Sequence, residues 1–185
     1  MPEDVAKWIA QGISVLTGIL AIIMMQMKNM KTILFFQIVV NLTASLNYLL
    51  LGGDSGAFIS LLAIIQSIVM FIFNMRKKKP HIAIIIAFAL CYVSISIYNI
   101  IASEEYFGIL PALAAICFCI SLVQEKPSLF RIWGTLNPSC WLIYDLMTGS
   151  YVMFCVHLGI LISTFVAMVR LDGIFRRKNS QGKNK

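Results

Sequence analysis

Seven long apolar stretches constrain this chain of 185 residues more than any other feature. Each holds about twenty residues, enough for a helix to cross about 30 Å of hydrocarbon. They cover residues 8–27, 32–51, 55–74, 81–101, 106–124, 128–148 and 151–171. The connections are short, and only 12% of the residues are charged, against about 25% in a soluble domain. The sequence therefore predicts an integral membrane protein with little chain left for a soluble domain.

The predicted spans are helices. An unpaired backbone group costs several kcal/mol in lipid, and the ten-residue alternation of a membrane barrel is missing. The first span is expected to be retained, because no basic region precedes it and no small-residue cleavage site follows it. The expected fold class is an all-α integral membrane protein with seven transmembrane helices.

Positive charges gather in alternate connections, as the positive-inside rule describes. These cations are Lys28, Lys31, Arg76, Lys77, Lys78, Lys79, Lys126, Arg131, Arg170, Arg176, Arg177 and Lys178. The other connections carry Asp54, Glu104 and Glu105. The pattern predicts an N-terminus outside and a C-terminus in the cytoplasm. The same pattern explains the net charge of +7 as a consequence of membrane topology. No nucleic-acid partner is therefore expected.

The chain also matches itself. Residues 8–75 align without a gap on residues 104–171, at a constant offset of 96 (108 − 12). Identical pairs include Gly12 and Gly108, Asn41 and Asn137, Tyr48 and Tyr144, Gly53 and Gly149, Phe58 and Phe154, and Ser67 and Ser163. Internal repeats of this kind often mark membrane transporters.

The repeat predicts the domain organisation. A unit of three helices would be inverted if its copy followed directly, so the fourth helix returns the chain and leaves the two copies parallel. We expect a first three-helix repeat at 1–75, a linker helix at 76–103, a second repeat at 104–172 and a basic cytoplasmic tail at 173–185.

This 3+1+3 plan resembles the SWEET sugar transporters and the wider PQ-loop clan, although their Pro-Gln dipeptide is absent here. The run from Cys140 to Asp145, followed by Gly149 and Ser150, resembles a bacterial inner-membrane protein family named for YgjV. Leu51-Gly52 and Ser55-Gly56-Ala57 are also similar to that family. The resemblance implies a multi-pass protein of the bacterial inner (plasma) membrane and brings no established activity with it.

Asn41 and Asn137 are the leading candidates for a substrate site. Each lies near the middle of its span, and an amide offers both a donor and an acceptor to a polar ligand. In a two-repeat transporter the substrate binds at this depth, between the repeats. The alternative is that both amides bond neighbouring helices, for about 0.6–2 kcal/mol each.

Other residues of the second and sixth spans extend this hypothesis. Trp141, Tyr48 and Tyr144 are expected to stack on a flat substrate, or else to serve as core and interface aromatics. Pro138 removes a helix hydrogen bond and so predicts a hinge beside Asn137, or a kink without a gating role.

Asp145 and His157 occur only in the second repeat, where Leu49 and Leu61 stand in the first. A carboxylate and an imidazole at similar depth would suit proton coupling. Alternatively, Asp145 reaches the outer interface and His157 bonds a backbone carbonyl.

No motif indicates an enzyme, a metal site or a cofactor. The five cysteines all fall in predicted spans without ligand spacing, namely Cys91, Cys117, Cys119, Cys140 and Cys155. The sequence therefore predicts a transporter of a small polar molecule that contacts membrane lipids. The rival hypothesis is a non-transporting binding or scaffold protein of the same fold. The substrate, the coupling ion and the oligomeric state, including a homo-oligomer, stay open.

Overall fold

The computed structural model describes residues 3–50, 54–103, 109–148 and 151–173. Within these ranges the chain forms seven α-helices and no strand, which confirms the all-α prediction. The helices are α1 (Glu3–Met25), α2 (Met30–Leu50), α3 (Asp54–Met75), α4 (Ile82–Ser103), α5 (Ile109–Leu122), α6 (Pro127–Thr148) and α7 (Tyr151–Leu171). The matched glycines Gly53, Gly108 and Gly149, the pair Glu104 and Glu105, and the tail from residue 174 lie outside the described residues.

Four helical segments among the described residues are long and apolar enough to cross a membrane. They are Trp8–Met25, Met30–Leu50, Ala57–Met75 and Met153–Leu171. The apolar segments Ile82–Tyr98 of α4 and Ile109–Leu122 of α5 are shorter. Helix α6 has the length of a span but carries Arg131, Asn137 and Asp145, which lower its hydropathy. Four of the seven expected spans are therefore supported directly.

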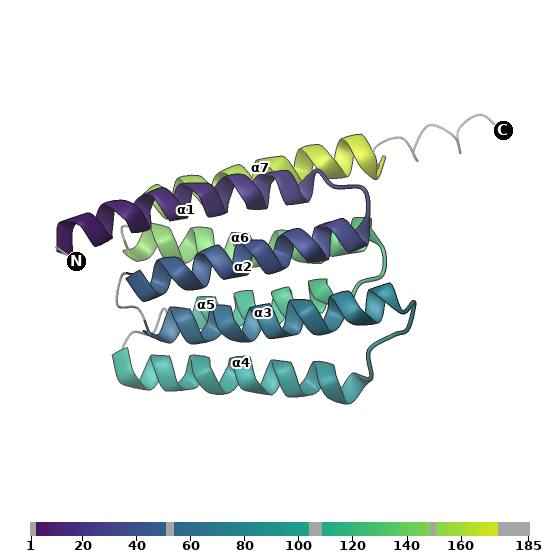
Figure 1. The fold of residues 1–185 in the computed structure, drawn as a ribbon, viewed down its shortest axis with the longest axis horizontal. Coiled ribbons are helices and arrows are strands. Elements are labelled where there is room, and N and C mark those ends of the chain that lie inside the picture. Colours follow the sequence, from purple (N-terminus) through teal and green to yellow (C-terminus); the bar gives the residue numbers. More distant parts are fainter. Residues whose placement is uncertain (1–2, 51–53, 104–108, 149–150, 174–185) are drawn as a thin grey trace.

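The seven helices lie alongside one another (Figure 1), and their contacts form a closed ring. Each helix contacts the next one along the chain, and α7 returns to contact α1. Large apolar side chains cover the outside of the ring, as lipid contact requires; examples are Phe35, Leu49, Ile86 and Ile162. We call the end where α1 begins and α2, α4 and α6 finish the hollow end. The opposite end, with the cation-bearing connections, is the basic end.

The contact between α1 and α7 depends on two glycines. A Cβ atom added at Gly18 would lie 2.8 Å from Cγ1 of Val156, and one at Gly159 would lie 3.3 Å from Cδ1 of Ile22. Small residues of this kind allow membrane helices to approach closely. The ring therefore closes at a seam with no room for a side chain at residue 18.

We expect Gly18→Ala to destabilise the protein by about 1–3 kcal/mol, because the new methyl group overpacks the seam. Val156→Ala in the same chain should relieve this clash, so that a double-mutant cycle gives a favourable coupling energy. Equilibrium unfolding in detergent measures both. Gly12→Ala is the matched control, since no atom lies within 4 Å of the added Cβ there. Equal losses at residues 12 and 18 would contradict this account of the seam.

A hydrophobic cluster fills the interior of the ring at the basic end. Its buried members are Met24, Met25, Met30, Ile33, Leu34, Met70, Leu122 and Phe130. They come from α1, α2, α3, α5 and α6. This cluster occupies the interior of the ring at the basic end.

Candidate functional site

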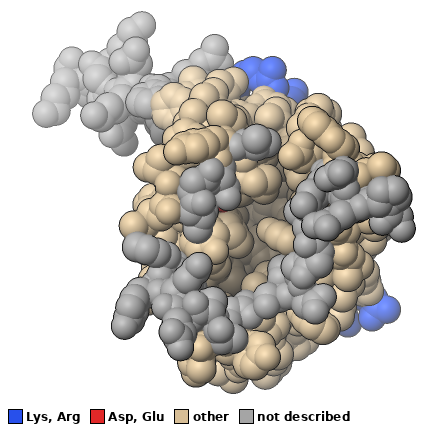
Figure 2. Space-filling view, turned by 90° about the vertical axis from the view of Figure 1, so that its left-hand side faces the viewer, with Lys and Arg blue, Asp and Glu red and all other residues tan. Residues whose placement is uncertain are grey.

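A cavity of about 720 Å³ lies inside the ring, and residues from all seven helices line it. This size is typical of small-molecule sites, which occupy about 300–1,000 Å³. Met24, Met25 and Phe130 of the hydrophobic cluster belong to its lining, so the cluster forms the base of the cavity. Figure 2 views the hollow end and shows a depression at its centre.

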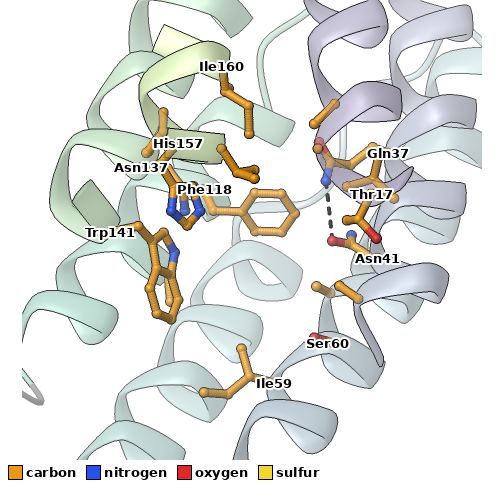
Figure 3. A pocket seen from close by; sticks show the side chains of 18 of the residues that line it. Thr17, Gln37, Asn41, Ile59, Ser60, Phe118, Asn137, Trp141, His157 and Ile160 are labelled. Atoms are coloured by element: carbon orange, nitrogen blue, oxygen red, sulfur yellow. Dashed lines mark hydrogen bonds between the residues drawn. The ribbon is translucent and has the colours of Figure 1, made fainter. Parts of the chain in front are cut away.

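Asn41 and Asn137 both line the cavity and lie on opposite walls, with Phe118 between them (Figure 3). Asn41 Nδ2 donates to Ser67 Oγ at 3.2 Å, and Asn41 Oδ1 accepts from Gln37 Nε2 at 3.3 Å. These bonds connect α2 with itself and with α3.

On the other wall, Asn137 Nδ2 donates to the carbonyl oxygen of Ala114 at 2.8 Å, which joins α6 to α5. Each amide thus bonds inside its own half of the ring and also borders the cavity. The two sequence-based interpretations, interhelical bond and pocket wall, apply to the same side chains.

Asp145 and His157 meet inside the cavity wall. Nδ1 of His157 lies 2.6 Å from Oδ2 of Asp145, and the two side chains are only 14% and 6% exposed. The His157 ring stacks on Trp141, with centroids 6.0 Å apart and planes 13° apart. Trp141 in turn meets Tyr144 edge to face at 5.7 Å. We call these four residues the Asp145 cluster. The sequence left open that Asp145 and His157 have separate partners, but the structure places them in direct contact.

Tyr48 and Pro138 also line the cavity. Helix α6 continues through Pro138 from Pro127 to Thr148 without interruption. Proline has no N–H for the carbonyl four residues earlier, which belongs to Gly134, another lining residue. The structure thus places a weakened point of α6 at the cavity, and a hinge there stays a prediction.

Sequence reasoning missed two polar groups of the cavity wall. Asn47 Oδ1 and the Tyr92 hydroxyl are buried and have no hydrogen-bond partner among the described residues. Asn47 has no polar equivalent in the second repeat, where Ile143 stands. Tyr92 belongs to α4, which the repeat assigned only a connecting role. The spacing of three residues from Asn41 to Ala44 and from Ala44 to Asn47 was the available signal that Asn47 borders the cavity with Asn41.

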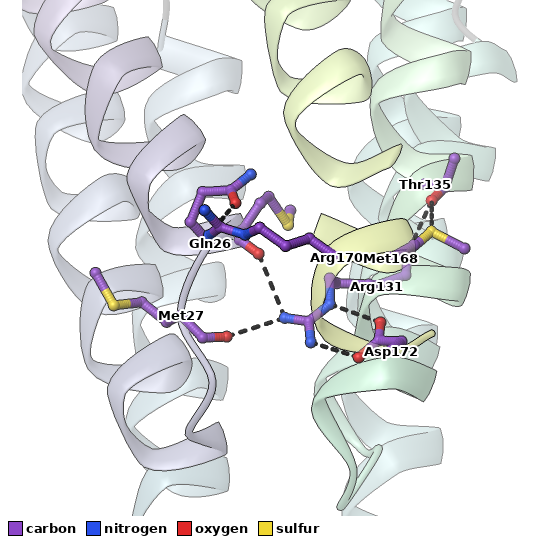
Figure 4. Close-up of polar contacts among 8 residues, drawn as sticks. Gln26, Met27, Arg131, Thr135, Met168, Arg170 and Asp172 are labelled. Carbon is purple, nitrogen blue, oxygen red and sulfur yellow. Dashed lines mark hydrogen bonds and ion pairs between the residues drawn. The ribbon is translucent and has the colours of Figure 1, made fainter. Parts of the chain in front are cut away.

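Arg131 corrects the loop assignment made from the charge pattern. It lies within α6, is 1% exposed and forms a bidentate pair with Asp172 at 2.9 and 2.7 Å (Figure 4). Its third nitrogen donates to the carbonyls of Met25 and Met27 at 3.3 and 2.9 Å. Met25 is the last residue of α1 and Met27 follows it in the connection to α2. Carbonyl groups at a helix end lack helical partners, and the dipole is negative there. Arg131 therefore joins α6, the end of α7 and the end of α1.

Two further contacts reinforce this junction. Gln26 Nε2 donates to Ser163 Oγ and to its carbonyl, both at 2.8 Å, and Arg170 donates to Gln26 Oε1 at 2.8 Å. Gly173 has φ 63, the left-handed conformation that ends a helix and that glycine adopts without strain. The turn there places Asp172 against Arg131. We call the contacts of Arg131, Asp172, Gln26 and Ser163 the basic-end junction.

An apolar-faced ring of helices around a partly polar cavity defines a helical membrane protein with an internal cavity. The profile of the Imp-YgjV family, described as a bacterial inner membrane protein, matches residues 8–174. The chain belongs to this family and is a bacterial inner-membrane protein. No curated protein and no solved structure matches it.

Proposed function

We propose that this protein carries a small polar molecule across the inner membrane by alternating access. The observation that carries the proposal is the cavity, which all seven helices line and which has amides on two walls. The hydrophobic cluster of the basic end forms its base. Polar groups at this depth of a membrane protein usually mark a substrate path. No enzymatic role and no nucleic-acid partner forms part of the proposal; membrane lipids surround the ring.

The helix contacts support a 3+1+3 organisation. Helices α1 to α3 adjoin in order, as do α5 to α7. Helix α7 contacts α1 directly, and α4 contacts both α3 and α5. Both Asn41 and Asn137, and both Tyr48 and Tyr144, line the one cavity. We propose that all seven helices span the membrane and that the two three-helix units rock around this cavity.

Charge supports one orientation of the ring. The basic end carries Lys28 and Lys126 in helix connections and Lys31 in the first turn of α2. Under the positive-inside rule this end faces the cytoplasm. The hollow end then faces outward, and the proposed carrier is in an outward-facing state.

Thermal unfolding of the detergent-purified protein against a metabolite library tests the proposal. A ligand at a hundred times its dissociation constant stabilises the fold by about 2.7 kcal/mol. We expect at least one small polar compound to raise the melting temperature of the wild type. The same compound should leave the Asn41→Ala, Asn137→Ala double variant unchanged, because its cavity walls have lost both amides.

Gln66→Leu provides the matched control. Gln66 Nε2 bonds Cys119 Sγ at 3.1 Å between α3 and α5, and Gln66 does not line the cavity. This variant should therefore keep the ligand response. If no compound shifts the wild type while the double variant alone loses stability, the amides only join helices and the scaffold hypothesis replaces the carrier.

A further inference from the structure

Among the described residues that line the cavity, only the Asp145 cluster carries an acidic or a basic side chain. Asp145 is the sole carboxylate of this described lining and His157 its sole basic group, with no lysine or arginine. From this charge pattern we infer that the cavity binds a small organic cation, such as an amine or a quaternary ammonium compound. The inference rests on the proposed carrier function and names its substrate class.

The charge balance of the wall supports a cation over an anion. A neutral imidazole donates from Nδ1 to Asp145, and the pair then carries one negative charge. A protonated imidazole leaves the pair neutral. In neither state do the described residues of the wall offer an uncompensated positive charge. A charge interaction in this partly buried site exceeds its value in water.

The contacts of His157 illustrate how a nitrogen-containing group binds to Asp145 and Trp141. Its ring lies 2.6 Å from a carboxylate oxygen on one side and stacks on Trp141 on the other. A carboxylate combined with an aromatic face is the arrangement that stabilises ligand cations.

The remaining groups of the wall also suit a cation that donates hydrogen bonds. Asn47 Oδ1, buried and without a partner among the described residues, is an acceptor only. It stands three residues before the end of α2, and Asp145 stands three residues before the end of α6. Both lie about 5 Å from the hollow end at about 1.5 Å per residue. Tyr48, one residue on from Asn47, adds an aromatic ring.

Isothermal titration of the full-length protein in detergent tests the inference with two probes of equal shape. One is choline, and the other is its neutral isostere, in which carbon replaces the quaternary nitrogen. We expect choline to bind and the isostere to bind at least about tenfold more weakly. Asp145→Asn, which keeps the size of the side chain, should weaken choline about tenfold or more. If Asp145→Asn does not fold, Trp141→Leu serves as the second variant and should weaken choline binding about threefold.

Gln66→Leu is the control, because Gln66 does not line the cavity. This variant should keep choline binding within about twofold. Equal binding of choline and its isostere, or unchanged binding by a folded Asp145→Asn variant, would overturn the cation class. So would a complete lack of response to choline, tetramethylammonium and ethylammonium. A neutral library compound that still stabilises the wild type would in each case leave the carrier proposal intact.

Discussion

Arg131→Ala should destabilise the protein by about 3–5 kcal/mol, the largest single loss we expect. The guanidinium is buried, and its removal leaves the Asp172 carboxylate unpaired at 8% side-chain exposure. It also leaves the carbonyls of Met25 and Met27 without their donor. Equilibrium unfolding in detergent, followed by helix content, measures the loss.

A second variant separates the buried charge from the rest of the junction. Arg131→Met combined with Asp172→Leu removes both charges together, and the double variant should recover most of the lost stability.

Lys79→Ala is the control for a surface pair. Lys79 and Glu125 lie 3.3 Å apart but are 83% and 59% exposed, so its loss should fall within experimental error. A single Arg131→Ala variant as stable as Lys79→Ala would contradict the role given to the junction.

Gly134→Phe should abolish ligand binding while the protein still folds. A Cβ atom at residue 134 would meet only Phe130 and Ser121, each at 4.0 Å, which is ordinary contact. Both neighbours line the cavity, so a benzyl group attached there extends into the space near its base. Asn137, one helical turn further on, lies on the same face of α6.

The measurement is the melting shift produced by whichever compound stabilises the wild type. Gly134→Ala is the control and should keep that shift, since its methyl group adds little volume. A Gly134→Phe variant that folds and still responds in full would place the ligand outside the cavity.

Much of the fold was predictable because membrane helices follow from length and hydropathy. The seven apolar stretches became seven helices with ends displaced by a few residues; α1, for example, begins at Glu3 rather than at residue 8. The closed ring was harder to predict from the sequence. Whether α7 contacts α1 depends on the seam at Gly18 and Gly159, and neither glycine stands out in an apolar sequence.

The site was predictable where a residue type is costly in a membrane. Asn41, Asn137, Asp145 and His157 attract notice for that reason, and all four border the cavity. The direct contact of Asp145 with His157 was only one of two alternatives, because it depends on the relative depth of two helices.

Arg131 was misassigned for a physical reason. A cation near a helix end usually marks a cytoplasmic connection, and its charge favours that side whether or not it is exposed. Its burial depends on Asp172, 41 residues away, and on two backbone carbonyls of α1. Backbone acceptors have no signature in the sequence, so the junction could not be predicted.

Cysteine labelling from the two sides of the membrane tests the carrier proposal most directly. The Asn137→Cys variant, in a background without the five native cysteines, is treated with a membrane-impermeant maleimide in right-side-out and in inverted vesicles. Leu136→Cys is the control, because residue 136 lies on the outer face of the ring at 45% exposure and should stay unlabelled in lipid. Alternating access predicts labelling of residue 137 from both sides, faster from the hollow end. Labelling from neither side, or from one side alone under every condition, would contradict it.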